Sequence, residues 1–223
     1  MAVTPPRQRR ALSERSPWLL ASLAAGIGYW FVRDGQLAGT FHLLLKGAGV
    51  ACLAIYALTW RKLPGALQLA AIMALGAAGD MALEIDFTLG AALFLIGHIV
   101  ALAFYLKRPR AQPSASQRGL AAALLLGTPL IAFLLTPAPM RWQVTLYALT
   151  LGAMAGAAWA SVFPRYRVGV GAVLFVLSDL LIFSRMGPLA RSAVPGLLIW
   201  PLYYFGQFLI CTGVIRALRA RKT

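Results

Sequence analysis

The chain has 223 residues, of which 60% are hydrophobic and only 12% are charged, whereas a soluble domain carries about 25% charged residues. This composition excludes an ordinary soluble enzyme, and at about 20 residues per crossing it suffices for about eight membrane crossings without a separate soluble domain. The net charge of +15 does not indicate a nucleic-acid partner, because the 21 basic residues stand in small groups between long apolar runs. That distribution is typical of membrane orientation signals.

Eight apolar runs, separated by charged or Pro- and Gly-rich breaks, predict a bundle of eight transmembrane helices. The runs cover 17–33, 38–60, 64–84, 87–106, 119–137, 141–163, 168–185 and 194–216. Polar residues do not alternate along them, which excludes transmembrane strands and leaves helices to satisfy the backbone in lipid. The basic segment before the first run resembles the start of a signal peptide, but seven further runs favour a membrane anchor. We therefore expect an all-α integral membrane protein.

The chain is predicted to form a single membrane domain, 17–216, between two basic tails, 1–16 and 217–223. The longest polar break divides this domain into the halves 17–108 and 119–216. A weak sequence similarity between the halves favours two parallel four-helix repeats. In this similarity, Gly79-Asp80 and Gly97-His98 of the first half correspond to Ser178-Asp179 and Gly206-Gln207 of the second half.

The distribution of Lys and Arg predicts how the chain is oriented. Sixteen of these residues fall in the two tails and the loops on one side, and four fall in the loops on the other side. The positive-inside rule then places both termini in the cytoplasm. The short Arg-rich loops favour the cytoplasmic membrane of a bacterium, and the sequence leaves the oligomeric state open.

Two carboxylates stand where an apolar bundle should have none. Asp80 and Asp179 lie inside the apolar runs AIMALGAAGDMAL and VLFVLSDLLIF, where a central carboxylate costs about 3 kcal/mol. We expect both to face a polar cavity. Glu84 follows Asp80 by four residues, which predicts that both lie on one face of the third helix. The alternative is that Glu84 is merely solvated at the membrane interface.

Five further polar side chains lie about 12 to 20 Å from the outer ends of their helices. At these depths they can line the same cavity. They are Lys46, His98, Tyr203, Tyr204 and Gln207. Each has an alternative role in packing. Lys46 can snorkel or neutralise one Asp in a buried ion pair, and His98 and Gln207 can form hydrogen bonds between helices. The two tyrosines can be packing or interface aromatics.

Two buried carboxyls that face one another share a proton, because repulsion and low dielectric disfavour a second charge. A protonated acid beside an ionised base suits general acid/base hydrolysis. No GxSxG elbow, HExxH pair, P-loop or GxGxxG fingerprint stands in a suitable context. Cys52 and Cys211 indicate neither a disulfide nor a zinc site. We therefore expect no metal and no cofactor.

Five segments together carry a family resemblance. They are Lys46, Gly79-Asp80, FLIGH ending at His98, GAVLFVLSD ending at Asp179 and YYFGQ ending at Gln207. In this order and spacing the chain resembles the YhhN family of membrane proteins over nearly its whole length. Gly47 and Ala101 depart from the family pattern, which commonly has Pro and an aromatic residue at these places. The departures concern the substrate more than the architecture.

The resemblance implies a hydrolase that cleaves the vinyl ether bond of a lysoplasmalogen, releasing a fatty aldehyde and a glycerophospho-base. It makes Asp80 and Asp179 the expected catalytic pair, one donating a proton and the other stabilising the oxocarbenium ion. Its partners would be a lysophospholipid substrate and membrane lipids. The expected supporting residues are Lys46, Glu84, His98, Ser178, Tyr203, Tyr204 and Gln207.

Two other functions stay open. In a small transporter or lipid-binding membrane protein, the buried acids and Lys46 would relay protons or bind a head group. In a purely structural bundle, the polar residues would serve packing alone.

Overall fold

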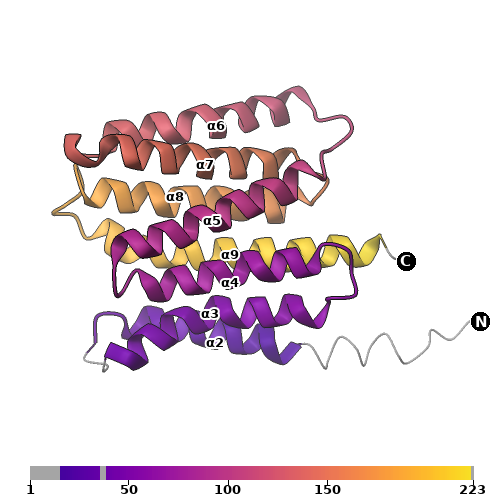
Figure 1. Cartoon of the computed structure of the whole chain (residues 1–223), viewed down its shortest axis with the longest axis horizontal. Helices are drawn as coiled ribbons and strands as arrows, with labels where there is room; N and C mark the ends of the chain where they lie inside the picture. Colours follow the sequence, from indigo (N-terminus) through magenta and orange to yellow (C-terminus); the bar gives the residue numbers. More distant parts are fainter. Residues whose placement is uncertain (1–15, 36–38, 222–223) are drawn as a thin grey trace, which may run out of the picture.

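Eight α-helices lie side by side in the computed structural model, which describes residues 16–35 and 39–221 (Figure 1). They are α2 (Ser16–Val32), α3 (Gly39–Thr59), α4 (Ala66–Ala82), α5 (Phe87–Leu106), α6 (Ala115–Leu135), α7 (Arg141–Ala160), α8 (Val170–Arg185) and α9 (Val194–Ala220). A 3₁₀ turn, Ala138–Met140, precedes α7, and a π-helical turn, Arg165–Gly169, precedes α8. These residues contain no strand, which confirms the all-helical prediction.

The helix ends differ from the predicted runs in places that have a local cause. α6 begins before the predicted residue 119 because a capping box stabilises its first turn. The Gln117 backbone N–H donates to the Ser114 hydroxyl at 3.3 Å, and the Ser114 N–H donates to the Gln117 side chain at 2.8 Å. α4 ends at Ala82, so Glu84 lies in the following turn. The third helix therefore ends before Glu84, although Glu84 and Asp80 both interact with Lys46.

The predicted tails are only partly covered by the structure. α9 continues beyond the predicted residue 216 as far as Ala220, so the C-terminal tail begins as helix. The predicted N-terminal tail lies outside the described residues, apart from Ser16 at the start of α2.

Helix length and composition support a membrane protein. Five segments of the described chain are long and apolar enough to cross a membrane. They are α3, α5, α6, α9 and α8 together with its preceding π-helical turn. α2 and α4 are apolar but shorter. α2 begins and α9 ends at the same end of the bundle (Figure 1).

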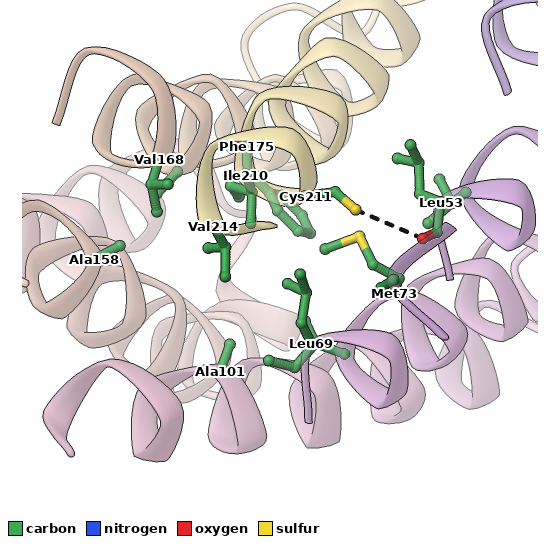
Figure 2. Packing of buried hydrophobic residues seen from close by; sticks show 14 of the residues in the cluster. Leu53, Leu69, Met73, Ala101, Ala158, Val168, Phe175, Ile210, Cys211 and Val214 are labelled. Carbon is green, nitrogen blue, oxygen red and sulfur yellow. Dashed lines mark hydrogen bonds between the residues drawn. The ribbon is translucent and has the colours of Figure 1, made fainter. Parts of the chain in front are cut away.

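The hydrophobic core joins the two halves of the sequence. Figure 2 shows Leu53 of α3 and Met73 of α4 packed close to Cys211 of α9, with Phe175 of α8 behind them. The Cys211 thiol donates to the backbone carbonyl of Leu53 at 3.5 Å. α9 therefore packs against helices of the first half as well as against α8.

A close approach of two backbones fixes α8 against α9. A Cβ atom on Gly171 would lie 2.6 Å from the Gly206 carbonyl oxygen, and one on Gly206 would lie 2.8 Å from the Gly171 carbonyl oxygen. Small residues permit such contacts between membrane helices. The contact lies two helical turns from Asp179 and one turn from Tyr203, so it sets the relative height of these two side chains.

Candidate active site

A cavity of about 390 Å³ lies among α3, α4, α5, α7, α8 and α9. Its walls are mostly apolar. The polar lining residues are Lys46, Asp80, Thr88, Gln143, Tyr147, Ser178, Asp179 and Tyr203. The exposed lining residues lie at the N-terminal ends of α5 and α7, so the cavity opens where the α4–α5 and α6–α7 connections lie (Figure 1). We call this end of the bundle the cavity end.

The two predicted aspartates reach this cavity from different helices. Asp80 lies near the end of α4 and Asp179 lies in α8, and only 2% and 5% of their surfaces are exposed. Both line the cavity, and they are close enough to interact electrostatically. The structure therefore brings together two carboxyls that are distant along the chain.

A tyrosine from a neighbouring helix holds each carboxyl. Tyr203 of α9 donates a hydrogen bond to Asp80 Oδ2 at 2.8 Å. Tyr147 of α7 donates a hydrogen bond to Asp179 Oδ2, also at 2.8 Å. Each bond satisfies one carboxyl oxygen and fixes the side chain, so the second oxygen is left for a ligand in the cavity.

Two further polar side chains stand behind this arrangement. The Gln207 side chain lies beside the Tyr203 hydroxyl and interacts with it. The Ser178 hydroxyl donates to the Ile199 backbone carbonyl at 2.9 Å, so it ties α8 to α9 while its residue lines the cavity. Both residues therefore support the position of the aspartates and tyrosines.

Lys46 lines the cavity but forms its ion pair with Glu84. The alternative in which Lys46 pairs with an Asp is therefore wrong, and so is the alternative in which Glu84 is only solvated. Glu84 Oε2 also lies 3.8 Å from Nε2 of His42, and this nitrogen hydrogen-bonds the Tyr29 hydroxyl at 3.1 Å. Lys46 still interacts electrostatically with Asp80.

Besides Glu84, three of the predicted residues do not line this cavity. His98 and Gln207 line a separate cavity of about 20 Å³. Tyr204 forms a hydrogen bond with the Ser22 hydroxyl of α2 at 2.9 Å. The prediction that one cavity holds all the polar residues is therefore wrong, because these three side chains point elsewhere around their helices.

The family comparison covers the whole of this site. The YhhN family model matches residues 41–214. The chain belongs to the YhhN family. The matched range includes both aspartates, both tyrosines that hold them and Lys46. Comparisons with curated proteins and with solved structures gave no match.

Sequence reasoning missed Tyr147 and His42 of this YhhN protein. Tyr147 could have been found from its depth, because it lies six residues after the start of α7, at about 9 Å. Asp179 lies six residues before the end of α8 and has the same depth. His42 gave no comparable signal, since it lies in the first turn of α3, where a polar residue is expected.

His98 is buried without a hydrogen-bonding partner. Neither of its ring nitrogens has one among the described residues, so the alternative of a bond between helices is wrong. Its ring instead contacts Phe94, Tyr147 and Phe175. An unpartnered buried polar group destabilises a fold by about 1–3 kcal/mol.

Replacing His98 with Phe is expected to raise the midpoint of thermal unfolding of the YhhN protein in detergent. Phe keeps the aromatic contacts and removes both unpartnered nitrogens. Gln207→Met is the matched control in the same small cavity and should lower the midpoint, because the Gln207 side chain interacts with the Tyr203 hydroxyl. A lower midpoint for His98→Phe would contradict the prediction and would indicate an ordered water on the ring.

Proposed function

We propose that this YhhN protein is a lysoplasmalogenase, a membrane hydrolase that converts a lysoplasmalogen and water into a fatty aldehyde and a glycerophospho-base. The observation that carries the proposal is the pair Asp80 and Asp179, each held by a tyrosine in one mostly apolar cavity. A cavity of about 390 Å³ falls in the size range of sites for small ligands, about 300–1,000 Å³. Family membership supports a function of this kind.

The proposal includes eight membrane crossings with both termini in the cytoplasm of a bacterium. Eleven basic residues of the described chain lie at the end of the bundle opposite the cavity end. All five acids of the described chain lie in the half nearer the cavity end. The positive-inside rule then orients the cavity mouth away from the cytoplasm.

The chemistry of a vinyl ether matches two carboxyls that share a proton. In the proposed mechanism, one aspartic acid protonates the β-carbon of the double bond, which leaves an oxocarbenium ion at the α-carbon. The ionised aspartate stabilises this cation and accepts a proton from the attacking water. The resulting hemiacetal breaks its bond to the glycerol oxygen, which takes a proton and leaves as the alcohol, while the α-carbon becomes the aldehyde.

The tyrosines have a defined part in this mechanism. Tyr147 and Tyr203 hold the two carboxyls in fixed orientations around the reacting double bond. Preorganised groups of this kind lower a barrier because they need not reorient during the reaction. The apolar walls of the cavity, which include Phe94 and Ile182, then accommodate the alkenyl chain.

The deciding experiment offers the purified protein a 1-alkenyl lysophospholipid in mixed micelles and measures fatty aldehyde. We expect aldehyde release that depends on the protein. The 1-acyl lysophospholipid with the same chain is the matched control and should release no fatty acid, because the mechanism needs a double bond to protonate. Absence of aldehyde would contradict the proposal, and proton-coupled flux in proteoliposomes without any product would favour a transporter.

A further inference from the structure

A second group of charged side chains lies beside the two aspartates. His42 and Lys46 occupy successive turns of α3, and Glu84 lies in the turn between α4 and α5. Their side chains are 18%, 14% and 33% exposed. Lys46 lines the cavity, and Leu83, the neighbour of Glu84, lines it too. Lys46 therefore belongs to the cavity wall, and Glu84 and His42 lie next to it.

The Lys46–Glu84 pair has unused binding capacity. The Lys46 ammonium carries three N–H donors, and Glu84 Oε1 is its one hydrogen-bond acceptor among the described residues. Glu84 Oε2 is 3.8 Å from the nearest nitrogen of His42, which is beyond hydrogen-bonding distance. An ion pair with a partly exposed partner adds little stability, so fold stability alone gives a weak reason for a Lys inside an apolar helix.

The charges of this pair complement a zwitterionic head group. We propose that Lys46 binds the phosphate of a lysophospholipid and that Glu84 binds the ammonium group attached to that phosphate. The inference rests on the proposed function and deepens it, since it assigns the head-group contacts of the substrate to two named residues. On binding, the intramolecular pair is exchanged for two intermolecular charge-assisted contacts.

The connectivity of the lipid agrees with this placement. In a lysoplasmalogen, only the short glycerol backbone separates the vinyl ether from the phosphate. Lys46 and Asp80 line one cavity and interact electrostatically. A lipid with its double bond between the aspartates therefore has its phosphate within reach of Lys46, and its ammonium group extends toward Glu84 at the cavity end.

The test compares two 1-alkenyl lysolipids that share one chain. The first has a phosphoethanolamine head group, and the second has a phosphoglycerol head group, which carries the phosphate without an ammonium. For Glu84→Gln we expect the KM of the first lipid to rise and that of the second to fall, so that the ratio of the two KM values changes about tenfold or more. The change frees Lys46 equally for both phosphates, so the ratio isolates the ammonium contact.

Two further variants complete the test. Asp86→Asn is the matched control, because it removes one negative charge two residues from Glu84 and keeps an acceptor for the Leu89 N–H. It should leave the ratio of KM values unchanged. Lys46→Met is combined with Glu84→Gln so that neither charge of the pair is left unpaired. This double variant should raise both KM values above those of the wild type. An unchanged ratio in Glu84→Gln would overturn the proposal and leave the pair a structural contact.

A binding measurement separates this inference from the proposed reaction. Saturated 1-alkyl lysolipids with the same two head groups have no double bond to protonate, so they report binding alone. The shift in thermal unfolding midpoint that each lipid causes should favour phosphoethanolamine in the wild type and lose this preference in Glu84→Gln. Equal shifts in the wild type would refute the head-group site even if aldehyde release is observed, whereas a preference without aldehyde release would refute only the reaction.

Discussion

Asp80→Asn and Asp179→Asn are each expected to lower the rate of aldehyde release by at least about a hundredfold, the usual contribution of a positioned acid or base. Asn keeps the size of the side chain and its acceptor oxygen for the tyrosine, but it neither donates a proton to carbon nor carries a negative charge. Loss of either carboxyl removes one member of the acid and base pair. The measurement is the initial rate of aldehyde formation at saturating lysoplasmalogen.

Asp34→Asn is the matched control for these two variants. Asp34 is 82% exposed and pairs with Arg33 outside the cavity, so its replacement should leave the rate within about twofold. Thermal unfolding of every variant in detergent shows whether it is folded. A folded Asp80→Asn or Asp179→Asn protein with the wild-type rate would end the two-aspartate mechanism.

Tyr147→Phe and Tyr203→Phe are expected to lower kcat by about tenfold to a hundredfold each. A hydrogen bond to a charged group contributes about 1.5–3 kcal/mol, and each variant removes the bond that orients one aspartate. The carboxyls themselves remain, so these losses should be smaller than those of the Asp→Asn variants. Initial rates over a range of lipid concentrations separate kcat from KM.

Tyr204→Phe provides the control for the tyrosine variants. Tyr204 neighbours Tyr203 on α9 and loses a hydroxyl of the same kind, but its hydrogen bond goes to Ser22 and it does not line the cavity. Its kcat should stay within about twofold of the wild type. Equal losses in Tyr204→Phe and Tyr203→Phe would show that a buried tyrosine hydroxyl affects only the general integrity of the bundle.

Local sequence patterns were enough to predict that the described part of this protein is helical and that two carboxylates are exceptional. A helix satisfies its own backbone, so an apolar run of sufficient length predicts it from local information. Asp80 and Asp179 stood out for an equally local reason, since each interrupts an apolar run at a high solvation cost. Family membership likewise followed from short segments in a fixed order, and it was confirmed over residues 41–214.

Which polar side chains share the cavity depends on helix packing, and the sequence did not reveal it. Counting residues from a helix end gives the depth of a side chain, but its direction around the helix axis depends on how neighbouring helices pack. Tyr203 and Tyr204 have nearly the same depth, yet one binds Asp80 and the other binds Ser22. For the same reason, Tyr147 joined Asp179 without having been predicted. Lys46 paired with Glu84 because α4 ends at Ala82 and the chain turns toward α3.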